Sequence, residues 1–208
     1  MKHFYFLMIT LLMGLSANAQ KTGTCGPNLN WQLTDDGVLT ITGTGQMDNY
    51  NDSYKGSPWS YKNVKQVIIA DGATTIGEYA FYFCTKLTSV NIPNSVTTIG
   101  NQAFSQCKAL TSINIPNGVT TIGNEAFRDC AALTSMNIPN SVTTIGNQAF
   151  DGCAALTSIN IPNGVTTIGY RTFYGCAALT SVEIPNSVTS IGISAFQLCT
   201  QLTSINIP

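Results

Sequence analysis

The sequence predicts a β-rich solenoid of 23-residue coils, with a parallel strand ladder and an N-terminal β-hairpin cap. Three observations predict this architecture. Phenylalanine recurs at a constant interval from position 81 to position 196, and cysteine recurs at the same interval from position 84 to position 199. A short alternating segment, such as Ser112-Ile113-Asn114-Ile115, repeats with them. A fixed period of this length, with apolar residues at set offsets, is typical of a leucine-rich-repeat solenoid.

Residues 1–19 are interpreted as a secretory signal peptide. Lys2 precedes an almost continuous apolar run from residue 4 to residue 15, and Ala17-Asn18-Ala19 fits a cleavage site before Gln20. The apolar run is ~12 residues long, whereas a membrane span needs ~20. We therefore expect an exported chain without a transmembrane anchor, either secreted or held at a cell surface.

Composition disfavours several classes of function. Only 9% of the 208 residues are charged and the formal net charge is −1, so we expect no nucleic-acid partner, which would need clustered lysine and arginine. Signal-peptide cleavage would remove His3, the only histidine, and with it any imidazole base or histidine metal ligand. We expect no catalysis and no cofactor, and an enzyme, for instance one acting on glycans, is the least favoured alternative.

Residues 20–63 do not follow the repeat and are expected to form the N-terminal cap. Residues 28–34 alternate polar and apolar side chains, Asp35-Asp36-Gly37 supplies a turn, and residues 38–42 alternate again. This pattern predicts a β-hairpin. Trp31, Trp59 and Tyr61 are expected to cover the first coil, because an uncovered solenoid end exposes core and a strand edge.

Residues 64–208 are expected to form about six coils and a final strand. In the unit that begins at Leu110, Ile113 and Ile115 face inward from the strand, and Pro116 ends strand pairing because it lacks an N–H. Asn117-Gly118 makes the next turn. One coil cannot bury these apolar residues alone, so stacking creates one continuous core.

The array stops inside a strand at residues 205–208. An exposed final strand readily pairs with another chain. We therefore expect either a fragment of a longer protein or end-to-end self-association through this coil.

The repeated phenylalanines and cysteines are interpreted as a structural ladder. Each cysteine follows a phenylalanine by three positions on the inward side, where cysteine behaves as a small hydrophobe. Free thiols are favoured, but stacked Cα atoms ~4.8 Å apart also permit disulfides, and a metal run is the third alternative. The ladder comprises Phe81, Phe104, Phe127, Phe150, Phe173 and Phe196, with Cys84, Cys107, Cys130, Cys153, Cys176 and Cys199.

Acidic residues indicate no strong site. Asp48, Asn51 and Asp52 suggest a calcium loop, but an EF-hand would need glycine at Ser53 and a glutamate at its twelfth position, so a plain polar loop is favoured. Three further acids on the array are interpreted as a solvated face: Glu125, Asp129 and Asp151.

Two surfaces are candidates for ligand binding. The outward strand residues, such as Ser112 and Asn114, hardly vary between coils, so they are either a binding surface or solubilising filler. The loops around Ala-Phe vary most and carry the residue types that anchor interfaces, although these side chains could instead shield the core. The candidate ligand contacts are Tyr79, Tyr82, Arg128, Tyr170, Arg171 and Tyr174.

The unit Leu-Thr-Ser-x-x-Ile-Pro-Asn-x-Val-Thr-x-Ile-Gly-x-x-Ala-Phe-x-x-Cys resembles the BspA-like leucine-rich repeat of bacterial surface proteins. Thr24-Cys25-Gly26, residues 39–45 and Pro58-Trp59 also resemble the leader found ahead of such repeats. The resemblance covers nearly all of the mature chain. It implies a secreted or surface solenoid that adheres to host proteins, including extracellular matrix, or to other cells. The alternative is a spacer array that displays other domains.

Overall fold

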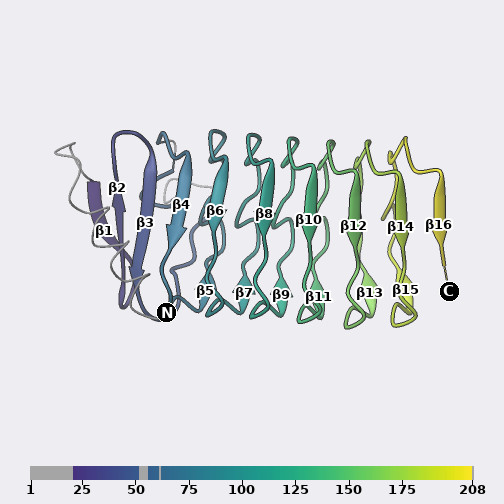
Figure 1. Cartoon of the computed structure of the whole chain (residues 1–208), viewed down its shortest axis with the longest axis horizontal. Coiled ribbons are helices and arrows are strands. Elements are labelled where there is room, and N and C mark those ends of the chain that lie inside the picture. Colours follow the sequence, from purple (N-terminus) through teal and green to yellow (C-terminus); the bar gives the residue numbers. More distant parts are fainter. Residues whose placement is uncertain (1–20, 52–55, 61, 208) are drawn as a thin grey trace, which may run out of the picture.

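A computed structural model describes residues 21–51, 56–60, 62–207 (Figure 1). The predicted signal peptide and the positions of Asp52 and Tyr61 lie outside these ranges. The described coils stack in one row, with each coil advancing along the long axis of the molecule. Within the described ranges, no helix has the length and apolar character needed to cross a membrane.

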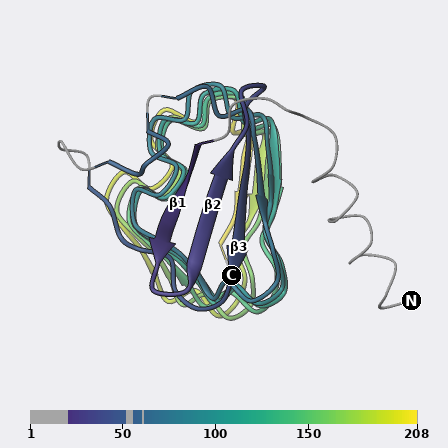
Figure 2. The same cartoon turned by 90° about the vertical axis from the view of Figure 1, so that its left-hand side faces the viewer.

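The cap is a three-stranded antiparallel unit at one end of the row (Figure 2). It consists of β1 (Lys21–Gly26), β2 (Leu29–Leu33) and β3 (Val38–Gly43). The hairpin of β2 and β3 lies where the polar–apolar alternation predicts it, whereas β1 is an addition that the sequence pattern did not indicate. Because β3 pairs in parallel with β4 (Gln66–Ile69), the cap continues directly into the ladder.

The main ladder contains one strand from each coil. Consecutive strands pair in parallel and paired residues face their equivalents in the next coil, as Ile113 faces Met136. One step is an exception, because β6 (Ser89–Asn91) and β8 (Ser112–Asn114) belong to two different hydrogen-bonded sheets. In the middle strands the apolar residue is buried and the flanking serine and asparagine are exposed, whereas Ile205 in the last strand is itself 38% exposed. After β4 the strands are β6 (Ser89–Asn91), β8 (Ser112–Asn114), β10 (Ser135–Asn137), β12 (Ser158–Asn160), β14 (Ser181–Glu183) and β16 (Ser204–Asn206).

A second ladder of short strands forms another side of the solenoid, seen along the lower edge of Figure 1. The Val-Thr-Thr-Ile segment predicted an inward-facing side here but not a strand. Its isoleucines are buried along most of the array, and the hydroxyl-bearing residue before each is more exposed. These strands are β5 (Thr75–Ile76), β7 (Thr98–Ile99), β9 (Thr121–Ile122), β11 (Thr144–Ile145), β13 (Thr167–Ile168) and β15 (Ser190–Ile191).

Glycine follows each short strand because neighbouring coils touch there through their backbones. A Cβ atom added to Gly146 would lie 2.4 Å from the backbone nitrogen of Asn124. Immediately after these glycines runs an asparagine ladder, in which each side-chain oxygen accepts a hydrogen bond from the next coil. The N–H of Asn124 donates to Asn101 Oδ1, that of Asn147 to Asn124 Oδ1 and that of Tyr170 to Asn147 Oδ1, each at 2.8 Å.

The core contains two regular columns. The six phenylalanine rings form one stack, with neighbouring centroids 5.1–5.7 Å apart and ring planes within 15° of parallel. Trp59 extends the stack toward the cap, 5.8 Å from Phe81. In the cysteine column, Sγ of Cys130 donates to the carbonyl of Phe104 at 3.2 Å, and the other repeat cysteines from Cys107 onward repeat this bond. All seven cysteines of the described ranges, Cys25 included, are free thiols.

Candidate interaction surface

The Ala-Phe loops form a rigid edge of the solenoid, although they contain no regular strand. Alternate N–H groups of one coil donate to carbonyls of the next, as from Tyr79 to Asn101 (2.9 Å), Phe81 to Ala103 (2.7 Å) and Phe83 to Ser105 (2.9 Å). The phenylalanine of each loop packs into the core on the inner side and is fully buried in every described coil except the last, where Phe196 is partly buried. Consequently, the backbone positions that carry the outward side chains are fixed relative to those of neighbouring coils.

Each loop also holds two residues in the left-handed backbone region, where a side chain with a Cβ atom costs about 1–2 kcal/mol. Among the described loops, glycine relieves this strain only at Gly152 and Gly175, so most coils retain a side chain there. Two of the predicted contact residues, Tyr79 (φ 55°) and Arg171 (φ 51°), are among the strained positions. The non-glycine set is Tyr79, Phe83, Gln102, Gln106, Glu125, Asp129, Gln148, Arg171, Ser194 and Leu198.

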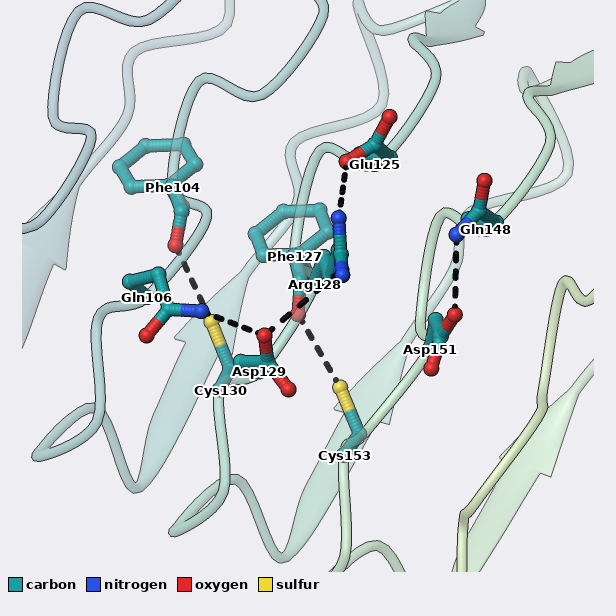
Figure 3. Close-up of polar contacts among 10 residues, drawn as sticks. All are labelled: Phe104, Gln106, Glu125, Phe127, Arg128, Asp129, Cys130, Gln148, Asp151 and Cys153. Carbon is teal, nitrogen blue, oxygen red and sulfur yellow. Dashed lines mark hydrogen bonds and ion pairs between the residues drawn. The ribbon is translucent and has the colours of Figure 1, made fainter. Parts of the chain in front are cut away.

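In the middle coils the loop side chains satisfy one another, as Figure 3 shows. Arg128 contacts the Glu125 carboxylate at 2.8 Å and that of Asp129 at 3.6 Å. The hydrogen bond to Glu125 is the main reason that the pKa of Arg128 is raised. Gln106 also donates to Asp129 from the preceding coil. Arg128, one of the predicted contact residues, is therefore already engaged within the solenoid.

The neighbouring coil contains a similar internal pair. Gln148 Nε2 donates to Asp151 Oδ2 at 3.0 Å, and Asp151 is only 8% exposed. The interpretation of Glu125, Asp129 and Asp151 as a solvated face is thus wrong in part, because Asp151 is buried and the other two hold Arg128. The hydrogen bonds of Gln106 and Gln148 were not predicted from the sequence, because the presence of a glutamine does not indicate which acceptor it reaches.

Two aromatic clusters lie toward the ends of this loop edge. In the fifth coil, the guanidinium carbon of Arg171 lies 4.0 Å from the centroid of the Tyr174 ring and 5.5 Å from that of Tyr170. Tyr170 is 42% exposed. In the first coil, the rings of Tyr79 and Tyr82 meet edge to face with centroids 5.5 Å apart.

The six predicted contact residues therefore do not form one site. Tyr170, Arg171 and Tyr174 form one cluster, Tyr79 and Tyr82 form another, and Arg128 belongs to the polar network between them. Four coils separate the two clusters, which corresponds to about 19 Å. A ligand that touched both would have to extend along the loop edge.

Arg171 differs from Arg128 in its partners. No described carboxylate lies within ion-pair distance of Arg171, and its Nε atom is buried without a hydrogen-bond partner. Its guanidinium lies over the Tyr174 ring and near the Tyr170 ring, and these cation–π contacts orient its plane. The cluster thus combines an oriented positive charge with an exposed aromatic face.

The cysteine column has no features of a reactive or metal-binding site. Burial raises the pKa of Cys84 and of Cys130 to about 12, and it raises that of Cys107 and Cys153 well above the ordinary value. A thiol must ionise to act as a nucleophile or metal ligand. Among the described residues, no group of three histidine, cysteine or acidic side chains is placed to hold a metal ion.

The main ladder presents a polar face with a hollow toward its C-terminal end. This groove of about 520 Å³ crosses β12, β14 and β16, lined by residues that include Ser158, Asn160 and Glu183. The side chain of Asn160 already bonds to the fold. Its Oδ1 accepts from the N–H of Ile138 (3.2 Å) and its Nδ2 donates to the carbonyl of Ile138 (2.8 Å). The described lining of the groove contains no aromatic side chain. It is therefore a weaker candidate for protein binding than the loop clusters.

A stacked array of similar coils, with rigid loops that carry non-identical side chains, defines a repeat protein of the leucine-rich-repeat class. The profile of the BspA type leucine-rich repeat region, a match of six copies, fits residues 57–139 and 120–208. The chain therefore belongs to the BspA type leucine-rich repeat family. This confirms the resemblance in the repeating unit, and the stacked parallel coils confirm the predicted fold class. No curated protein matches the chain.

Solved structures of bacterial leucine-rich repeat proteins have the same architecture. The chain is 28% identical to the T. pallidum leucine-rich repeat protein TpLRR, with a TM-score of 0.68, and the match covers 88% of this chain and 92% of that one. A leucine-rich repeat protein from Bacteroides ovatus gives 26% identity and a TM-score of 0.75. That match covers 94% of this chain but only 53% of the B. ovatus chain, so this chain spans about half of that relative.

Proposed function

We propose that this protein is an exported, non-catalytic interaction module that adheres to protein ligands, extracellular-matrix proteins or other cells through its loop edge. The repeat class supports protein binding, because solenoids offer extended surfaces for partners. We assign adhesion, and a secreted or cell-surface location, on the basis of the BspA-like resemblance in the repeating unit. The predicted signal peptide supports export.

The cluster of Tyr170, Arg171 and Tyr174 is the observation that carries this proposal. Tyrosine and arginine are the residue types most enriched in binding hot spots, where a few side chains supply most of the affinity. Here they are rigidly placed and partly exposed, and the positive charge has no carboxylate partner among the described residues. Coils with the same backbone carry polar pairs that satisfy themselves, so the cluster is not required to build a coil.

Binding of the mature chain to a panel of immobilised extracellular-matrix proteins tests this proposal. The triple substitution Tyr170→Ala, Arg171→Ala and Tyr174→Ala should weaken binding at least tenfold, because each hot-spot truncation typically costs about 2 kcal/mol or more. A matched control changes Ser112, Asn114 and Ser135 to alanine on the strand face and should retain binding. Equal loss in both variants would contradict a loop-edge site.

The second candidate function is a spacer that displays other domains. The uniform strand face favours it, since Ser112 and Asn114 recur in equivalent coils almost without change. A wild-type chain that binds no matrix protein and no cell would favour the spacer.

Export can be tested independently of binding. Expression of the full chain in a bacterial host with an active secretion system should yield a mature protein that begins at Gln20. N-terminal sequencing of the exported material gives this residue directly. Retention of residues 1–19 on a cytoplasmic product would contradict the proposed location.

The last described coil exposes apolar side chains that support end-to-end self-association. Ile193 is 78% exposed, Leu198 53% and Ile207 63%. An exposed apolar surface beside an unpaired strand edge favours pairing with a second copy of the chain. Light scattering should detect a dimer of residues 20–208 that Leu198→Glu dissociates, and a strictly monomeric wild type would contradict self-association.

A further inference from the structure

Four lysines gather at one corner of the first three coils, at the turn that precedes each long strand. They are Lys62, Lys65, Lys86 and Lys108, here called the lysine corner, and all four are exposed. Beyond Lys108 the sequence contains no further lysine. The corner is therefore a local concentration of positive charge in a chain with a net charge of −1.

The lysine corner departs from the repeat. Lys108 occupies a position that later coils fill with Ala131, Ala154 and Ala177, and Lys62 lies at the end of the cap, two repeat lengths before Lys108. Alanine suffices to build this corner, so the lysines are not needed for the fold. Because Lys62 and Lys108 are two coils apart, their Cα atoms lie about 10 Å from each other, with Lys86 on the coil between them.

A hollow of about 280 Å³ lies within the lysine corner, lined by Lys62, Asn63, Phe83, Thr85 and Lys86. Phe83 contributes an aromatic surface that is 41% exposed. Its backbone is left-handed, with φ of 61°, where the equivalent residues of two later coils are Gly152 and Gly175. The first coil therefore retains a strained bulky aromatic residue beside the lysines.

The charges of the lysine corner are not neutralised by the carboxylates of the described chain. Both ion pairs in the described ranges are made by Arg128, and neither involves these lysines. The β2–β3 turn, which carries Asp35 and Asp36, borders the corner at Lys65, whose N–H donates to the carbonyl of Gly37 at 2.8 Å. Lys62, Lys86 and Lys108 are thus the core of the positive patch.

We infer that the lysine corner binds a sulfated polysaccharide. Lysine ammonium groups are compact point charges on flexible stems, suited to sulfate groups spaced along a chain rather than to one bidentate carboxylate. The separation of Lys62 and Lys108 is comparable with one disaccharide repeat of such a polymer. The Phe83 ring offers a face on which a sugar ring packs. This site is distinct from the Tyr170 cluster, so either can fail without the other.

Titration of the mature chain with a heparin hexasaccharide tests the inference. Wild-type protein should bind at low salt, and the affinity should fall as salt rises. The triple substitution Lys62→Gln, Lys86→Gln and Lys108→Gln should weaken binding roughly tenfold or more, because it removes three charge contacts. These side chains are exposed, so the unfolding transition should not change. Undetectable wild-type binding, or equal binding by the variant, would overturn the inference.

Three controls assign the effect to this site and this class of ligand. Lys21→Gln removes one positive charge elsewhere and should leave heparin affinity within about twofold of wild type. Chemically desulfated heparin should not bind. Duplex DNA of equal charge should bind more weakly than heparin, and equal affinity for DNA would overturn the assignment to a polysaccharide.

Discussion

Arg171 lies with its guanidinium carbon 4.0 Å from the centroid of the Tyr174 ring, on the same loop. Two coils earlier, the same pair of positions holds Glu125 and Arg128, which form an ion pair at 2.8 Å. The loop backbone is the same in both coils, but the two arginines differ in whether their positive charge is already paired with a carboxylate. The Arg128 guanidinium pairs with carboxylates, whereas the Arg171 guanidinium packs against aromatic rings.

The ion pair of Arg128 should matter little for stability. Its arginine and glutamate side chains are 43% and 22% exposed, and exposed pairs contribute between 0 and about 1 kcal/mol. Urea unfolding of Glu125→Gln should therefore show a loss of less than about 1 kcal/mol, and high salt should reduce it further. A loss several times larger would mean that the network in Figure 3 is a buried structural element.

The phenylalanine stack should supply much of the stability. Phe127 is fully buried between Phe104 and Phe150, so Phe127→Ala should lower the free energy of unfolding by about 3–5 kcal/mol. Phe127→Leu keeps more of the volume and should cost clearly less. Urea titration followed by circular dichroism measures both, and an alanine effect below about 1 kcal/mol would show that the coils do not depend on this column.

A glycine that follows a short strand, such as Gly146, should not tolerate a side chain. A glycine in the Asn-Gly turn, such as Gly164, should tolerate one. Gly146→Ala places a Cβ atom 2.4 Å from a backbone nitrogen of the preceding coil, and we expect a loss of about 1–3 kcal/mol or more. Gly164→Ala is the matched control, because its Cβ atom would approach no atom closer than 3.1 Å, with a Thr143 methyl group at that distance and the Val142 carbonyl oxygen at 3.2 Å. Equal thermal stability of the two variants would contradict the backbone contact at Gly146.

The buried thiols should make stability decrease at high pH. The ordinary pKa of the thiol is 9.0, and burial raises the pKa of Cys84 and Cys130 to about 12 in the folded chain. Between these values the unfolded chain releases protons that the folded chain retains, so rising pH favours unfolding. The thiols should leave the urea midpoint unchanged well below pH 9.0 and lower it as the pH rises above that value. A midpoint that rises over this range would contradict the buried thiols.

Thiol titration separates free cysteines from disulfides. At neutral pH the folded chain should react slowly with alkylating reagents, with the half-buried Cys199 reacting first, because protonated buried thiols are poor nucleophiles. After denaturation without reductant, all seven thiols of the mature chain should react. A smaller number would show that some neighbouring cysteines are bridged.

The repeat period predicted the parts of the fold that depend on one-dimensional spacing. It identified the coils, the inward strand residues such as Ile113, and the columns to which Phe127 and Cys130 belong. These follow from sequence because each coil stacks on an equivalent copy. The asparagine ladder through Asn124 was not predicted, because it depends on which backbone N–H each side chain reaches.

The candidate site was harder to predict from sequence, because it also depends on contacts between neighbouring coils. Residue type marked Tyr170 and Arg171 as interface anchors, and it marked Arg128 in the same way. Whether an arginine is neutralised depends on which residues share its loop and the adjacent coil. The lysine corner was missed because the near-neutral net charge hides local clustering. The period alone could have revealed it, since Lys108 stands where later coils have alanine.

Hydroxyl-radical footprinting of the mature chain, with and without a bound matrix protein, tests most directly whether the loop edge is the binding surface. Tyrosine side chains are readily oxidised, and Tyr170 is 42% exposed in the free protein. Binding should reduce oxidation of Tyr170 and Tyr174 while urea stability of the solenoid is retained or increased. Unchanged oxidation of both tyrosines in a saturated complex would contradict binding at the loop edge and place the ligand on another face.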